Sequence, residues 1–264
     1  MMVLHPVRVT IENLPSDYLL SIEKPVHPKN PAMGTNIIPF TSTVYIDADD
    51  FRTTHSNDFF RLSPGASVGL LNVPNPITYV SHEENAAGEV TSIVCHYEDG
   101  ETKPKPKAWI QWVAEHAPSN SPVRVAETRI FKRLFKSDNP AALGDAYLDD
   151  IDPDSLTKVS GAMLETGIWS VIEKSLAAAR ATVEQRKQDA LEMGVEAPPS
   201  VDGLETIRFQ GLRVAYFALD LDSKLVSLDE GRGAGEGGQD RLVLNLVAPL
   251  KQDSTKKAVE AKNA

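Results

Sequence analysis

The chain has 264 residues, of which 41% are hydrophobic, and a formal net charge of −10 at neutral pH. This length and apolar content are enough for one large domain or two small ones with a buried core, which excludes a wholly disordered chain. Its one cysteine, Cys95, cannot form an internal disulfide, and the sequence contains neither a signal-peptide pattern nor a membrane-spanning apolar run. These features predict a soluble protein of a reducing compartment.

Positive charge is concentrated between residues 103 and 136, where eight lysine and arginine residues stand against two glutamates. An acidic stretch follows between Asp138 and Asp154. Proteins bind nucleic-acid phosphates through lysine and arginine, which displace counterions from the nucleic acid. The net charge of −10 therefore argues against a protein that binds nucleic acid through a uniformly basic surface. Composition alone therefore does not indicate RNA, and a solvated surface with a local charge bias explains the pattern at least as well.

The first half of the chain contains short segments in which apolar and polar residues alternate. Proline-rich breakers separate them at residues 25–31, 63–65 and 75–76, because proline lacks the N–H and fixes φ. Strand length and period 2 predict strands at residues 7–11, 43–46, 67–73, 77–80, 90–97 and 107–113. Many short strands with regular turn signals favour a β-barrel or a β-sandwich.

The second half begins with a predicted helix at residues 168–193. Apolar residues at helical spacing share one face, which favours core packing over a groove for a partner helix: Trp169, Ile172, Leu176, Ala179, Val183 and Ala190. Gly194 predicts the end of the helix. Strand patterns return at residues 206–209, 214–219, 225–228 and 241–247, the last two on either side of a glycine-rich loop at 231–238.

Three short motifs suggest catalysis or nucleotide binding, but their contexts do not fit. Residues 65–69 match G-x-S-x-G, which requires a strand-to-helix turn in a hydrolase, and a strand pattern follows instead. Residues 233–238 match G-x-G-x-x-G, which requires a helix directly after it, and again a strand pattern follows. Cys95 and His96 are strand neighbours that point to opposite faces, so we expect Cys95 to be a small buried hydrophobe.

Longer strings are more informative than these motifs. The chain opens with Val-Leu-His-Pro-Val-Arg-Val-Thr-Ile-Glu-Asn-Leu-Pro at residues 3–15, and further strings follow at 27–34, 44–51, 59–65, 105–113, 132–135, 139–140, 152–156 and 209–217. In order and spacing they resemble the C-terminal anticodon-binding region of glutaminyl-tRNA synthetases of the eukaryotic cytosolic type. The similarity covers nearly the whole chain except residues 168–200 and the glycine-rich loop.

The resemblance implies a mostly β fold of two β-barrels, the distal barrel inserted in the proximal one, with one long amphipathic helix. It implies a proximal barrel at residues 1–52 and 129–255, a distal barrel at 53–128, a helical insertion at about 168–193 and a flexible tail at 256–264. Because the family's chain returns to its first barrel, we expect the strands of residues 7–11 and 241–247 to share a barrel.

The family reads unstacked anticodon bases in pockets on and between the barrels, which suits single-stranded RNA because its bases can be splayed. The resemblance implies six tRNA-binding residues: Arg61 and Arg213 at the third base, Gln210 at the middle base, Asn72 beside the first base, and Lys29 and Asn30 in a tRNA-contacting turn. Arg61, Gln210 and Arg213 are expected to meet at one RNA-facing surface.

The sequence departs from the family pattern at several positions near these residues. Phe60 stands where many members have lysine, and Gln111 replaces a common histidine. Other members have arginine where this chain has Gly69, Leu71 and Leu246. These departures affect recognition of the first base and leave the third-base arginines in place.

The function that the resemblance implies is tRNA anticodon recognition in support of attaching glutamine to its tRNA. The two ATP-holding strings of class I synthetases are missing, so we expect no active site, metal or cofactor here. ATP and magnesium would belong to a catalytic domain upstream in the same synthetase, of which this chain is expected to be a piece. The expected partners are glutamine tRNA and that catalytic domain, without DNA or a membrane, in the cytoplasm. The alternative is a non-catalytic protein-interaction scaffold of the same fold that has lost RNA binding.

Overall fold

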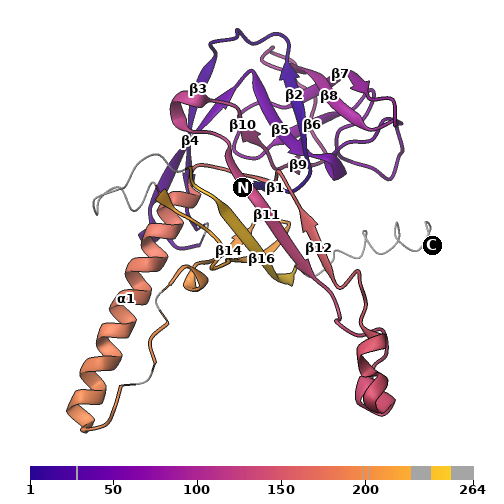
Figure 1. The fold of residues 1–264 in the computed structure, drawn as a ribbon. Helices are drawn as coiled ribbons and strands as arrows, with labels where there is room; N and C mark the ends of the chain where they lie inside the picture. The colour runs from indigo at the N-terminus through magenta and orange to yellow at the C-terminus, as the bar shows by residue number, and fades with distance from the viewer. Residues whose placement is uncertain (28, 198, 202, 227–238, 251–264) are drawn as a thin grey trace. The chain divides into compact units, whose positions relative to one another are not determined.

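The computed structural model describes residues 1–27, 29–197, 199–201, 203–226 and 239–250, and most of its regular elements are strands (Figure 1). The chain forms two compact units. The first comprises Met1–Arg124 and Gly161–Lys174, and the second comprises Val125–Ser160 and Ser175–Ala264. Within the described residues, no helix has the length and apolar character needed to cross a membrane.

The first unit is built on a seven-stranded sheet with the order β10-β5-β2-β8-β7-β6-β9. Its strands are β2 (Pro6–Ile11), β5 (Thr43–Asp47), β6 (Ser67–Leu70), β7 (Ile77–Glu84), β8 (Val90–Tyr97), β9 (Trp109–Ile110) and β10 (Val113–Ala114). The two edge strands, β9 and β10, are almost consecutive in the sequence. The sheet is therefore curled back on itself, as expected for a β-barrel.

Two smaller pairings complete the strands of the first unit. The hairpin of β3 (Leu19–Pro25) and β4 (Thr35–Thr41) forms a separate two-stranded sheet. β1 (Met2–Val3) pairs with β13 (Met163–Leu164), which in turn pairs with Val123 and Arg124. Short 3-10 helices lie at η1 (Pro31–Met33), η2 (Ala48–Asp50) and η3 (Ala117–Ser119).

Alternation of side chains fills the interior of this barrel. On β2, Val7, Val9 and Ile11 are buried while the residues between them are not, as the period of 2 predicts. The largest buried rings are Phe40 and Trp112, which meet edge to face with centroids 5.3 Å apart. Cys95 is buried in the same core, as predicted, and burial raises the pKa of its thiol to about 12.

The second unit contains a curled sheet in which β12, β11, β16, β15 and β14 follow one another. These strands are β11 (Val123–Phe131), β12 (Leu156–Val159), β14 (Arg208–Gly211), β15 (Ala215–Leu219) and β16 (Leu242–Pro249). The β11–β16 pair is parallel, and the other pairs are antiparallel. Two 3-10 segments, η4 (Pro140–Asp150) and η5 (Leu204–Thr206), lie outside the sheet.

The helix α1 (Ile168–Met193) has the predicted bounds. Ile172, Val183 and Ala190 on its predicted apolar face are buried, whereas Trp169, Leu176 and Ala179 are half-buried. The core-packing interpretation of the whole face stays a prediction. Gly194 has φ of 65°, and the N–H groups of Gly194 and Val195 donate to the carbonyls of Leu191 and Ala190. This is a Schellman motif, which favours glycine because the left-handed conformation is strained for other residues.

The fold class is confirmed, but one topological expectation is wrong. The strands of residues 7–11 and 241–247 fall in different sheets. Both edges of β2 are occupied, one by β5 and the other by β8, so no edge remains for a strand from the end of the chain. Residues 1–52 and 53–128 were expected in different barrels, whereas residues 1–124 lie together in the first unit.

Several strands were not predicted. The apolar alternation of β3, β4 and β11 is interrupted by proline, asparagine or charged residues, so period 2 did not predict these strands. The predicted strand at 107–113 is divided into β9 and β10. The glycine-rich loop, the tail at 256–264 and part of the strand predicted at 225–228 lie outside the described residues.

Candidate nucleic-acid interface

Arg61 lies just before β6, in a segment bridged to the start of the same barrel. The backbone of Leu62 exchanges hydrogen bonds with Asp50 and Arg52, which holds this segment against η2. The Arg61 guanidinium contacts the Asp50 carboxylate at 2.8 Å and donates to the carbonyl of Asp49 at 3.1 Å. Its side chain is 34% exposed. The arginine is thus oriented by the η2 turn while part of its surface faces solvent.

Asn72 occupies the turn between β6 and β7. It is exposed and has φ of 65°, in the left-handed region. The turn is anchored on both sides: the N–H of Val73 donates to the carbonyl of Leu70, and the indole N–H of Trp112 donates to the carbonyl of Leu71 at 2.9 Å. Asparagine tolerates this conformation better than most residues, so Asn72 suits the turn irrespective of any ligand.

Lys29 and Asn30 lie at the tip of the β3–β4 hairpin, on a different sheet from Arg61 and Asn72. Both are exposed. The side-chain oxygen of Asn30 accepts a hydrogen bond from the N–H of Ala32 at 3.2 Å and so caps η1. Asn30 therefore has a structural role that the sequence pattern did not reveal.

Gln210 and Arg213 lie on the β14–β15 hairpin of the second unit. Gln210 is exposed and faces Tyr216 directly across the two strands. Arg213 is exposed in the connecting turn, which is closed by a 2.8 Å hydrogen bond from the N–H of Val214 to the carbonyl of Gly211. The expected meeting of this hairpin with Arg61, which belongs to the first unit, stays a prediction.

Backbone strain marks one of these positions. In the described part of the chain, the non-glycine residues with positive φ are Asn72, Asn120 and Arg213, whose φ is 61°. For a residue other than glycine, asparagine or aspartate, the left-handed conformation costs about 1–2 kcal/mol. Such strain concentrates at functional sites, because a structure retains it only where the side chain is needed or the surroundings demand it.

The basic segment at residues 103–136 divides into two parts. Arg129 contacts Glu127 at 2.5 Å, Asp222 at 2.6 Å and Asp220 at 3.0 Å. The hydrogen bond that Arg129 donates to Glu127 is the main cause that raises the Arg129 pKa above its ordinary value. Arg133 pairs with Asp138. In contrast, Lys105 and Lys107 line a pocket of the first unit. The segment is therefore not one continuous basic surface.

Comparison with known proteins assigns the family. Two family models match residues 1–98 and 109–177, and both describe the anti-codon binding domain of class I (E and Q) tRNA synthetases. The chain belongs to this family.

Curated relatives align with this anticodon-binding domain over nearly its full length. A probable glutamine–tRNA ligase of Schizosaccharomyces pombe is 38% identical over 95% of the chain, and the glutamine–tRNA ligase of Saccharomyces cerevisiae is 35% identical over 97%. The glutamine–tRNA ligase protein virJ of Hypocrea virens is 40% identical over 97%. The chain spans between 28% and 34% of the length of these three relatives.

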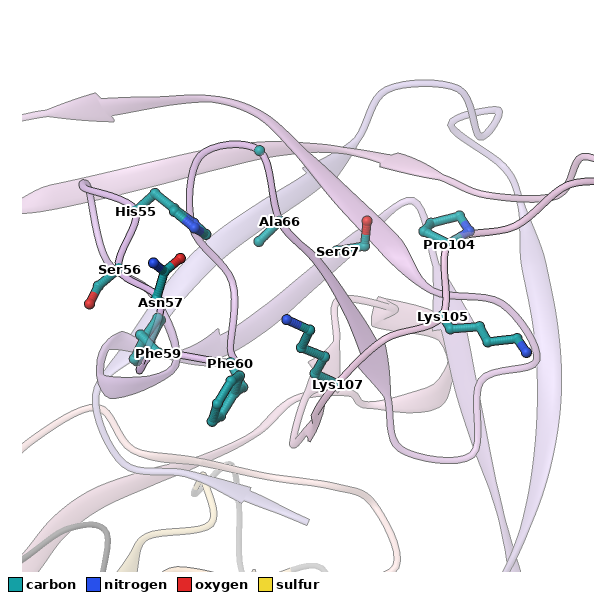
Figure 2. Close-up of a pocket in the computed structure, with 11 residues that line it drawn as sticks. His55, Ser56, Asn57, Phe59, Phe60, Ala66, Ser67, Pro104, Lys105 and Lys107 are labelled. Carbon is teal, nitrogen blue, oxygen red and sulfur yellow. The ribbon is translucent and has the colours of Figure 1, made fainter.

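The anticodon-binding domain also has residues near the candidate site that were not predicted to bind RNA, among them Phe60, which in the sequence is only a departure from the family pattern. Tyr216, which is 47% exposed, is the cross-strand neighbour of Gln210. His55, Asn57 and Phe60 line the same pocket as Lys107 (Figure 2). In a sequence, an aromatic residue close to a basic segment indicates a site of this kind. Here that signal is weak, because Phe60 and Lys107 are more than forty positions apart.

Proposed function

We propose that this chain is the anticodon-recognition region of a cytoplasmic glutamine–tRNA ligase. It would bind glutamine tRNA, while a catalytic domain of the same protein, with ATP and magnesium, would attach the amino acid. The observation that carries the proposal is the match of two anticodon-binding family models, together with relatives named glutamine–tRNA ligase that align over 95% to 97% of the chain. A relative from Arabidopsis thaliana, 42% identical over 61% of the chain, is named as cytoplasmic.

The proposed recognition rests on hydrogen-bonding chemistry at separate positions. Arg61 and Arg213 present planar forks of N–H donors, which match the two acceptors on a guanine edge. The amide of Gln210 both donates and accepts, so it can pair with the edge of a uracil. Asn72 would stand beside the first base, and Lys29 and Asn30 would lie in a turn that contacts the tRNA. The exposure of Gln210 and Arg213 on one hairpin supports this assignment.

A filter-binding assay with a glutamine tRNA transcript, a non-cognate transcript and two salt concentrations tests the proposal. RNA binding should weaken steeply as salt rises, because each phosphate contact releases counterions. The glutamine tRNA should bind more tightly than the non-cognate tRNA at both concentrations. Absence of salt-sensitive binding would instead favour a protein-interaction scaffold, and equal binding of both tRNAs would refute anticodon recognition.

A further inference from the structure

A pocket in the first unit is formed by residues of three segments, 55–60, 65–67 and 104–107, and has a volume of about 220 Å³. Its charged lining residues are Lys105 and Lys107, and His55 and Asn57 add polar groups. None of the lining residues, all of them in the described part of the chain, is acidic. The carboxylate of Asp58, in the first of these segments, accepts a hydrogen bond from the lining residue Ser56. In a chain with a net charge of −10, a lining that carries two lysines and no acidic residue favours an anionic ligand.

An aromatic ring and an ammonium group lie together at this pocket. Phe60 is 51% exposed, and the Nζ atom of Lys107 lies 5.6 Å from the centre of its ring. Figure 2 shows Lys107 extending toward Phe60, whereas Lys105 extends away from them. An exposed phenylalanine beside a cation is the combination with which proteins hold single-stranded nucleic acid, since the ring stacks on a base and the cation attracts the phosphate.

The loop that carries Phe60 is anchored before any ligand binds. The N–H of Arg52 donates to the carbonyl of Leu62, and the N–H of Ala66 donates to the carbonyl of Ser63. The guanidinium of Arg52 lies over the ring of Phe59, the residue before Phe60, at 4.4 Å from the ring centre. Less conformational entropy is therefore lost when a ligand is bound than for a mobile loop.

The size of the pocket limits what it accepts. At about 220 Å³ it is smaller than the pockets of roughly 300–1,000 Å³ that enclose drug-sized molecules. A whole folded partner or a dinucleotide does not fit, but one base or one phosphate group does. The half-exposed ring at the rim leaves the rest of a longer chain in solvent.

We propose that this pocket is a subsite for one unpaired nucleotide of the bound RNA, with the base stacked on Phe60 and its phosphate held by Lys107. The proposal rests on the proposed function, because the RNA is supplied by tRNA binding. Since Phe60 precedes Arg61 in the chain, the nucleotide in this subsite would neighbour the one that Arg61 reads. Stacking is tolerant of base identity, so the subsite contributes affinity and position, whereas the arginine contributes sequence discrimination.

The test measures binding of a glutamine tRNA transcript and of its isolated anticodon stem–loop to the full chain and to Phe60→Ala. Loss of one base–aromatic stack is expected to weaken both complexes about tenfold. Phe60→Tyr retains the ring and should bind like the parent chain. Lys107→Gln should weaken binding and reduce the salt dependence, whereas Lys105→Gln, whose side chain extends away from Phe60, should have the smaller effect. Melting temperatures should be unchanged, because Phe60 is half exposed.

Cross-linking locates the nucleotide directly. A thiouridine-substituted anticodon stem–loop, irradiated on the parent chain, should attach to a peptide that contains Phe60 or Lys107. If the parent chain binds glutamine tRNA but Phe60→Ala binds it equally well, the subsite is refuted while the proposed function stands. If the parent chain binds no RNA, or the pocket binds an acidic peptide in its place, both proposals fail.

Discussion

At the scale of single residues, Arg213 combines a strained backbone with an exposed charged side chain. Its φ of 61° is one that glycine adopts without strain, yet the chain has arginine there. Asn72 has a similar conformation at little cost, because its residue type tolerates the left-handed region. The strain at Arg213 is therefore the stronger indication that an arginine side chain is needed at its position.

Replacement of Arg213 by alanine and by glycine separates the contribution of the side chain to RNA binding from the effect of the backbone strain on stability. Both changes remove the guanidinium. In a full-length ligase both should therefore reduce charging of glutamine tRNA by about tenfold to a hundredfold, which is the discrimination that one bidentate base contact provides. Only glycine relieves the backbone strain, so Arg213→Gly should be up to about 1 kcal/mol more stable to urea than Arg213→Ala. Steady-state charging and urea unfolding measure the two effects. Normal charging by both variants would show that the arginine is structural.

At the scale of elements, strand β11 carries an arginine that forms ion pairs with acidic residues from another segment of the second unit. Arg129 on this strand contacts Asp220 and Asp222, which follow β15, as well as its near neighbour Glu127. The hydrogen bond from Arg129 lowers the pKa of Glu127. A hydrogen bond from the N–H of Asp222, helped by Asn245 and Arg129, lowers the pKa of Asp220.

The pH dependence of this cluster follows from the direction of these shifts. A carboxylate whose folded pKa is lowered contributes stability that is present above its unfolded pKa of about 4 and is lost as the pH falls through the lower folded value. Arg129→Gln should therefore lower the melting temperature by a few degrees at neutral pH. The difference from the parent chain should begin to shrink on acidification to about pH 3, where these carboxylates are largely protonated in the unfolded chain.

Arg133→Gln is the matched control. Its partner is Asp138, and the two side chains are 71% and 92% exposed, so this pair should contribute nothing measurable to the melting temperature. Thermal unfolding followed by circular dichroism at the two pH values compares both variants with the parent chain. Equal melting temperatures for the Arg129 and Arg133 variants at neutral pH would show that the Arg129 cluster is no more than a surface ion pair.

At the scale of the whole molecule, the chain corresponds to only a part of its relatives. It spans 28% of the probable ligase of Schizosaccharomyces pombe and 30% of that of Saccharomyces cerevisiae. The ATP-binding strings of class I synthetases do not occur in the sequence. On the proposed function, recognition and chemistry would reside in different parts of the ligase.

Glutamine-dependent exchange between pyrophosphate and ATP tests this division. The chain alone should give no exchange above a buffer blank, because its sequence contains no pattern that holds ATP. A full-length glutamine–tRNA ligase, assayed with the same reagents, provides the positive control. Exchange by the purified chain would show that an adenylate-forming site exists within these 264 residues.

Much of the local structure could be predicted from sequence, because its causes are local. The alternation from Val7 to Ile11 predicted β2, and the period of the apolar residues after Ile168 predicted α1 up to its glycine cap at Gly194. β11 was missed because its apolar alternation ends after Val125, where the polar residues Glu127, Thr128 and Arg129 follow. The charge of Arg129 is compensated by Asp220 and Asp222, some ninety residues later in the chain.

By itself, the sequence determined the family, the predominance of strands and the candidate residues, since these depend on residue types in a fixed order. Only the tertiary structure decided that β2 lies between β5 and β8, because strand pairing joins distant segments and depends on which edge is open. It also decided that Asn30 caps η1 and that Phe60 lies beside Lys107. Periodicity assigns a residue to a face, but only the folded chain determines which distant residue lies next to it.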